Sequence, residues 1–215
     1  MLNATGKYGL RVIMQHFLGN LHLNSRESQA SQHHADAGIK DTCVPNLIEL
    51  CRQGDRVAQK SLFDTLAPKM FSVCLRYMGD RATAEDVLQD GFITLFTKLD
   101  SYSGEGSFEG WARKIFVNTA LMSLRKTDAL SLSDDIEVAR GVGDGVATPV
   151  QNLGYKELMK LIAQLPTGFR TVFNLYVLEG YSHKEIADAL GISKNTSRSQ
   201  LLRARMMLQE RIRKE

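Results

Sequence analysis

The most constraining feature of this sequence is the spacing of its apolar side chains, which recur every three or four residues over long stretches. Residues 80–98 show it well, with apolar positions at Ala84, Val87, Leu88, Phe92, Leu95 and Phe96. That spacing places them on one side of a helix, and no segment shows the strict alternation expected of a half-buried strand. Apolar residues make up 43% of the chain, enough to fill a core. The sequence therefore predicts an all-α fold.

The helical pattern falls into two blocks separated by a segment of different composition. Residues 46–127 contain four expected helices with short connections, which can enclose one core. Residues 128–148 carry three glycines, no aromatic residue and a net negative charge, as is typical of a flexible linker. The pattern resumes over 149–215, whereas 1–45 has no sustained periodicity and is expected to be a disordered extension. We expect two small helical domains joined by a flexible linker.

Composition also excludes several protein classes. The 3 cysteines are an odd count without paired spacing, which argues against a disulfide framework and favours a reducing cytoplasm. His33 and His34 are adjacent and point in different directions on any regular element, so we expect no metal site there, and no cofactor. The uncharged stretches fall short of the roughly 20 apolar residues that cross a bilayer, so membrane insertion is not expected.

The end of the second block has the form of a helix-turn-helix. Ser182 and Glu185 fit a capping box that opens a short helix, Gly191 supplies the turn, and Ser193 caps a long helix. From Lys194 to Glu215 the chain carries 7 basic and 2 acidic residues, a balance that suits the phosphates of DNA. The side chains expected to enter a major groove are Lys194, Asn195, Arg198, Ser199, Leu202 and Arg203.

Three segments together resemble bacterial sigma factors of the extracytoplasmic-function type, a two-domain group of the sigma-70 family. They are AEDVLQDGFITLF (84–96), FEGWARKIFVNTALMSLRK (108–126) and LPTGFRTVFNLYVLEGYSHKEIADALGISKNTSRSQLLRARMML (165–208). Their order and separation match the family's region 2, linker and region 4, and the 45-residue front extension departs from the pattern. The resemblance implies a protein without catalytic activity that binds core RNA polymerase and directs promoter-specific transcription initiation.

The resemblance also implies a role for one polar face of the helix expected at 80–98. Asp86, Gln89 and Asp90 lie at positions i, i+3 and i+4, so they share one face. In the family, this face docks on the clamp helices of the largest polymerase subunit. Carboxylates and an amide suit a basic partner surface.

The family's −10 element is recognised and melted by the helix matching 108–126 and by the loop before it. Aromatic, amide and cationic groups supply stacking, edge hydrogen bonds and phosphate contacts to an unstacked base. The residues implied here are Phe108, Trp111, Arg113, Lys114, Asn118, Arg125 and Lys126, although Trp111 equally suits the core. The resemblance further implies that region 4 reads the −35 element and that an anti-sigma factor occludes both surfaces.

Two alternatives stay open when the residues are taken alone. A stand-alone regulator would use only the helix-turn-helix, with front helices that bind a ligand or dimerise, but it has no need of the acidic face at Asp86 and Asp90. A helical adaptor has no need of Arg198 and Arg203. An enzyme ranks last because the sequence shows no nucleophile with an adjacent base, no glycine-rich phosphate loop and no ligand-spaced cluster.

Overall fold

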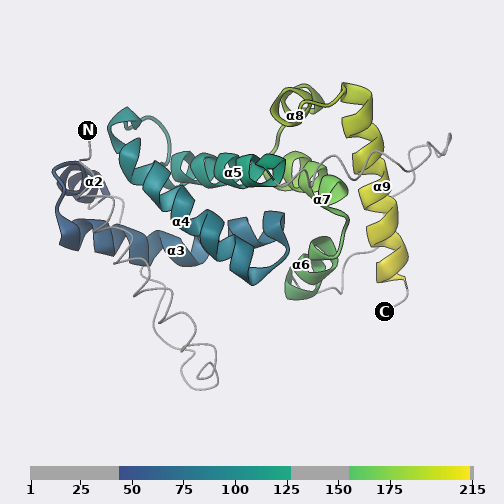
Figure 1. Cartoon of the computed structure of the whole chain (residues 1–215), viewed down its shortest axis with the longest axis horizontal. Coiled ribbons are helices and arrows are strands. Elements are labelled where there is room, and N and C mark those ends of the chain that lie inside the picture. Colours follow the sequence, from purple (N-terminus) through teal and green to yellow (C-terminus); the bar gives the residue numbers. More distant parts are fainter. Residues whose placement is uncertain (1–43, 127–154, 214–215) are drawn as a thin grey trace, which may run out of the picture. The chain divides into compact units, whose positions relative to one another are not determined.

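The computed structural model describes residues 44–126 and 155–213 (Figure 1). Every regular element in these ranges is a helix, which confirms the all-α prediction. Of the extension expected at 1–45, residues 1–43 lie outside the described residues and the last two begin α2; the linker and residues 149–154 also lie outside. The described residues form two compact units: one holds 44–74 and 81–119, and the other holds 75–80, 120–126 and 155–213.

The first unit is built from the front helices. They are α2 (Val44–Arg52), α3 (Arg56–Met78, up to Cys74), α4 (Arg81–Thr97), the short 3-10 helix η2 (Leu99–Ser101) and α5 (Phe108–Lys126, up to Thr119). Two side-chain caps form here: Asp55 Oδ1 accepts the Ala58 N–H at 2.8 Å, and Ser107 Oγ accepts the Gly110 N–H at 3.1 Å. Short polar side chains therefore begin α3 and α5, as in most helix N-termini.

Three phenylalanine rings form the centre of this unit. Phe92 of α4 lies 4.4 Å from the Phe63 ring of α3 and 5.0 Å from the Phe116 ring of α5, measured between centroids. Gly91 allows α4 and α5 to approach this closely, because a Cβ at that position would lie 2.3 Å from Phe116 Cδ1. The absence of a side chain at Gly91 thus sets the distance between these two helices.

The second unit contains the rear helices. They are α6 (Tyr155–Ala163), α7 (Thr167–Phe173), η4 (Asn174–Leu178), α8 (His183–Leu190) and α9 (Lys194–Ile212). The sequence predicts one helix from Thr167 to Leu178, but its last five residues are a π-helix, in which the Glu179 N–H reaches back to the Asn174 carbonyl at 3.0 Å. The wider turn places Asn174 and Leu175 both inside, each 0% exposed.

The Arg170 side chain of α7 holds the second unit together through hydrogen bonds to backbone carbonyls of other residues. Only 6% exposed, its guanidinium donates at 2.8–3.1 Å to carbonyls of Tyr77, Met78, Ala163 and Leu165. Burial lowers the pKa of Arg170, and arginine still remains charged in such a site. Gly79 adopts φ 84° beside it, where a Cβ would meet Arg170 Nη1 at 2.9 Å. One side chain thus satisfies backbone carbonyls at the C-terminal ends of both α3 and α6.

Candidate nucleic-acid interface

The helix-turn-helix predicted from the sequence is present in the second unit. Ser182 Oγ accepts the Glu185 N–H at 3.3 Å, and Glu185 Oε2 accepts the Ser182 N–H at 2.8 Å, which completes the capping box. Gly191 ends α8 in the left-handed region at φ 70°, where glycine is favoured. Ser193 Oγ then accepts the Thr196 N–H at 2.9 Å and begins α9. Each local signal in this segment forms the structure that it predicts.

Helix α9 separates a buried side from an accessible one. Ser197, Leu201, Ala204 and Leu208 are buried, with Leu201 and Leu208 4–5% exposed. None of the six side chains predicted to enter a groove is buried: Lys194, Asn195, Arg198 and Leu202 are exposed, and Ser199 and Arg203 are half-buried. The structure therefore brings the predicted −35 residues together on the accessible surface of one helix, as groove recognition requires.

His183, which sequence reasoning missed, ties the start of α8 to α9. Its Nδ1 lies 2.9 Å from Oγ of the buried Ser197, and its ring stacks on Tyr176 at 4.6 Å between centroids. Arg205 lies over the same Tyr176 ring, with its guanidinium carbon 5.9 Å from the ring centroid. Burial first, and then the charges of Arg198 and Arg205, lower the pKa of His183.

We expect this imidazole to titrate below its ordinary value of 6.5. A histidine with a lowered pKa binds its proton more readily in the unfolded chain, so the stability of the second unit falls as the pH drops through 6.5. An NMR titration of the His183 ring tests the midpoint, and denaturant unfolding at several pH values tests the sign. In His183→Gln, the part of the pH dependence due to this residue should vanish; a midpoint at or above 6.5 in the native protein would contradict the expectation.

An aromatic cluster lies where the loop after η2 meets the start of α5. The Tyr102 ring lies 5.1 Å from Phe108 and 5.3 Å from Trp111, and these two lie 5.4 Å apart. Phe108 is 7% exposed, whereas Tyr102 and Trp111 are half-buried. Tyr102 was not predicted as a site residue, and its place inside the expected loop was the available signal. The partly exposed rings offer stacking surface, with Phe108 packed as support.

The other predicted −10 residues lie further along α5. Lys114 and Asn118 are exposed and one helical turn apart, Arg125 and Lys126 are exposed in the last turn, and Arg113 is half-buried. Cations at the end of a helix are favoured by its dipole. The exposed Lys114, Arg125 and Lys126 are accessible to phosphate oxygens. Arg113, in contrast, interacts with other groups of the protein.

The polar face of α4 has the geometry predicted for a partner surface. Asp86 and Asp90 are exposed and Gln89 is half-buried, whereas the residues that alternate with them, such as Val87 and Leu88, are buried. Within residues 44–126 and 155–213, neither carboxylate makes an ion pair; the nearest pair on α4 joins Arg81 and Glu85. The two charges are thus not neutralised by the part of the chain that the structure describes.

The described residues offer no other chemistry. In 44–126 and 155–213, no group of three His, Cys, Asp or Glu side chains could hold a metal ion. Burial raises the pKa of Cys51 to about 11 and that of Cys74 to about 12, so both free thiols are poor nucleophiles. Within the same ranges, no helix combines the length and apolar character that a bilayer crossing needs.

Comparison with known families gives two matches. The sequence profile of Sigma-70 region 2 matches residues 62–129, and that of Sigma-70, region 4 matches residues 155–208. The first covers the aromatic cluster and the acidic face of α4, and the second covers the helix-turn-helix. Both matches fall on the surfaces described above.

Full-length relatives are similar over most of the chain. The ECF RNA polymerase sigma-E factor of Haemophilus influenzae is 32% identical over 77% of this chain and 93% of its own. The ECF RNA polymerase sigma factor SigW of Bacillus subtilis is 28% identical over 79% of this chain and 97% of its own. The solved sigma factor RpoE of Bartonella quintana, in complex with the anti-sigma factor NepR, superposes with a TM-score of 0.44 at 23% identity, covering 72% and 96%.

Proposed function

This chain belongs to the extracytoplasmic-function group of the sigma-70 family and is an RNA polymerase sigma factor, and on that premise we propose which of its surfaces perform each step of promoter-specific initiation. The polar face of α4 binds core polymerase. The aromatic cluster and α5 engage the −10 element, and the exposed side of α9 engages the −35 element.

The proposal rests on one observation above all: two exposed surfaces of opposite charge stand on different helices of the same chain. Asp86 and Asp90 on α4 present carboxylates without ion-pair partners in the described chain. Arg198 on α9 presents an exposed cation among hydrogen-bonding side chains. An acidic surface repels DNA and suits a basic protein helix, whereas the cationic surface suits DNA. A factor that joins polymerase to a promoter needs both.

The −10 surface combines the groups needed to hold an unpaired base. Tyr102 and Trp111 supply half-buried rings that can stack on a base, and Lys114 and Asn118 supply an exposed cation and an amide one turn apart. Base stacking on an aromatic side chain contributes about 1 to 3 kcal/mol. That energy offsets part of the cost of unstacking the promoter duplex.

Replacing Arg198 and Arg203 together by Ala is expected to lower transcription from a cognate promoter. A bidentate base contact contributes about 1 to 3 kcal/mol of discrimination, so each lost contact weakens recognition by about fivefold or more. Lys160→Ala/Arg213→Ala, which removes two exposed cations outside the six predicted residues, is the matched control for loss of charge. Run-off transcription from promoters with matched and scrambled upstream elements gives the measurement. Equal output from both templates with the native protein would refute the −35 assignment.

Reconstituted transcription tests the proposal as a whole. Core polymerase is supplied with a genomic promoter library, with and without this protein, and the transcripts are sequenced. We expect a small set of start sites that appears only when the protein is present. A stand-alone regulator would give none with core polymerase alone, and an adaptor would instead inhibit a holoenzyme that is already active.

Three further properties belong to the same proposal. Catalysis resides in the polymerase, and this chain contributes binding energy without a metal or cofactor. Its place of action is the cytoplasm, where the polymerase is. An anti-sigma factor that covers the α4 and α9 surfaces would hold the protein inactive, as the sigma-70 resemblance implies.

A further inference from the structure

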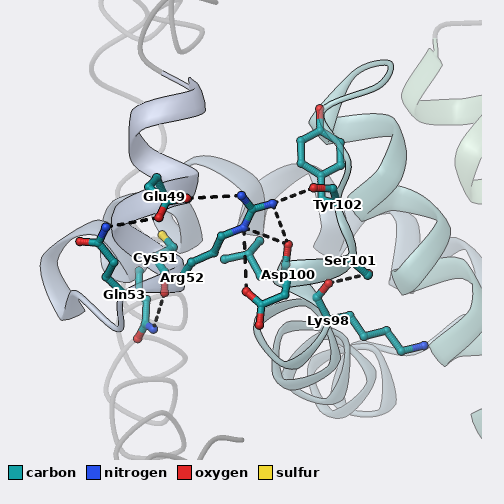
Figure 2. A network of polar contacts seen from close by, with 10 residues as sticks. Glu49, Cys51, Arg52, Gln53, Lys98, Asp100, Ser101 and Tyr102 are labelled. Atoms are coloured by element: carbon teal, nitrogen blue, oxygen red, sulfur yellow. Dashed lines mark hydrogen bonds and ion pairs between the residues drawn. The ribbon is translucent and has the colours of Figure 1, made fainter.

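Arg52, the last residue of α2, joins that helix to the chain segment that leads into the aromatic cluster. Its Nη2 donates to the Tyr102 carbonyl at 2.7 Å and to the Leu99 carbonyl at 3.3 Å, and its Nε lies 3.4 Å from the same Leu99 oxygen. Figure 2 shows the guanidinium lying between α2 and this segment, with Glu49 on one side and Asp100 on the other. The shortest bond goes to Tyr102, just after η2, and the other backbone partner is Leu99, the first residue of η2.

These contacts fix the start of the loop from Tyr102 to Ser107. The Tyr102 carbonyl is held by Arg52, and the Tyr102 hydroxyl donates to the Gly106 carbonyl at 2.9 Å, which closes the loop on itself. Gly104 and Gly106 have φ values of 84° and 73°, so the loop is shaped by conformations that glycine favours. One residue, Tyr102, is thus held at its backbone by Arg52 and at its ring by the loop, by Phe108 and by Trp111.

We propose that Arg52 is a positioning residue for promoter opening: it holds Tyr102, and with it the loop and the Trp111 ring, in the arrangement that receives an unpaired base. This inference rests on the proposed −10 role of the aromatic cluster. Arg52 is not itself one of the proposed DNA-binding residues and acts through the backbone at Leu99 and Tyr102.

The geometry requires arginine rather than any cation. A planar guanidinium presents several N–H groups in a fixed fork, and here it reaches two carbonyls and the Glu49 carboxylate, the latter at 3.4 Å. A lysine ammonium keeps the charge but reaches fewer acceptors in this arrangement. The side chain is 29% exposed, so the bonds are partly shielded from water. Arg52→Lys should therefore retain part of the function and Arg52→Gln little of it.

The test uses the full chain bound to core polymerase on a duplex promoter found by the reconstitution above. Arg52→Gln is expected to form about tenfold fewer open complexes than the native protein, from the loss of charge-assisted hydrogen bonds. Arg56→Gln, an exposed residue at the start of α3, makes the same change of charge and should have no such effect. Binding to core polymerase and the thermal midpoint should be alike in both variants.

Two readouts separate positioning from a general loss of structure. Trp111 is the only tryptophan in the sequence, so tryptophan fluorescence reports on the aromatic cluster. The emission should change in Arg52→Gln and not in Arg56→Gln. A double-mutant cycle with Tyr102→Phe, which removes the bond to Gly106, should be non-additive because both changes release the same loop. Independent effects on promoter opening would overturn the proposal.

The outcomes also separate this inference from the proposed function. If Lys114→Ala with Asn118→Ala impairs opening but Arg52→Gln does not, the positioning role alone is refuted. If none of these variants impairs opening, the −10 assignment itself is wrong. A change in Trp111 emission without any loss of open complexes would show that Arg52 holds the loop but that promoter opening does not depend on it, which also overturns the inference.

Discussion

Reversing the charge at both Asp86 and Asp90, in the variant Asp86→Lys/Asp90→Lys, is expected to weaken binding to core polymerase by about 100-fold or more. Like charges forced together across an interface cost several kcal/mol, and each 1.4 kcal/mol is a factor of ten. Both carboxylates are exposed on α4 and neither has an ion-pair partner in the described chain, so the fold loses no contact. Affinity measured by fluorescence anisotropy against core polymerase, without DNA, gives the result.

The matched control for this variant is Glu105→Lys/Asp188→Lys. It makes the same change of net charge at two exposed acids that lie outside the α4 face. Its affinity for core polymerase should stay near that of the native protein, and the thermal midpoints of both variants should differ little from it. Equal binding by the α4 variant and its control would remove the assignment of this face. Equal loss in both would show that only total charge matters.

Arg170→Met is expected to lower the free energy of unfolding of the second unit by about 3 to 5 kcal/mol. Methionine fills a similar volume but donates nothing, so the buried carbonyls of Tyr77, Met78, Ala163 and Leu165 lose their donor. An unsatisfied buried carbonyl costs more than the bond itself contributes. Denaturant unfolding followed by circular dichroism, together with hydrogen exchange over residues 165–208, measures the loss.

A second arginine of the same unit provides the comparison. Arg211 also donates to backbone carbonyls, those of Leu161 and Gln164, each at 3.3 Å, but its side chain is only half-buried. Arg211→Met should therefore cost about 1 kcal/mol, because water replaces the lost bonds. If Arg170→Met unfolds at the same denaturant concentration as Arg211→Met, the carbonyl cluster does not stabilise the unit as described.

The sequence predicts well those features whose partners are close along the chain. Ser182 and Glu185 are three residues apart, and Gly191 directly follows α8, so the residue types themselves carry the signal for the cap and the turn. The faces of α4 and α9 follow from spacing in the same way. For this reason the sequence alone places the groups predicted to bind polymerase on one face of α4 and those predicted to bind the −35 element on one face of α9.

Arg52 and Arg170 could not be predicted in that way. Their partners are backbone carbonyls, 50 residues away for the bond from Arg52 to Tyr102 and 93 residues away for the bond from Arg170 to Tyr77. Every residue has a carbonyl, so no residue type marks the acceptor, and only the folded chain brings donor and acceptor together. The π-helix at Asn174–Leu178 is a similar case, because the sequence pattern there fits an ordinary helix.

The missing side chain at Gly91 has a mechanical meaning for the first unit. It lets the backbone of α4 at Gly91 pack directly against the Phe116 ring of α5. Close packing of this kind resists movement of one helix along the other. Asp90 precedes that glycine, and Asn118 follows that ring by two residues. If Asp90 binds polymerase and Asn118 binds DNA, as proposed, a shift of α4 on the polymerase is transmitted to Asn118 through this packed contact, without a flexible segment in between.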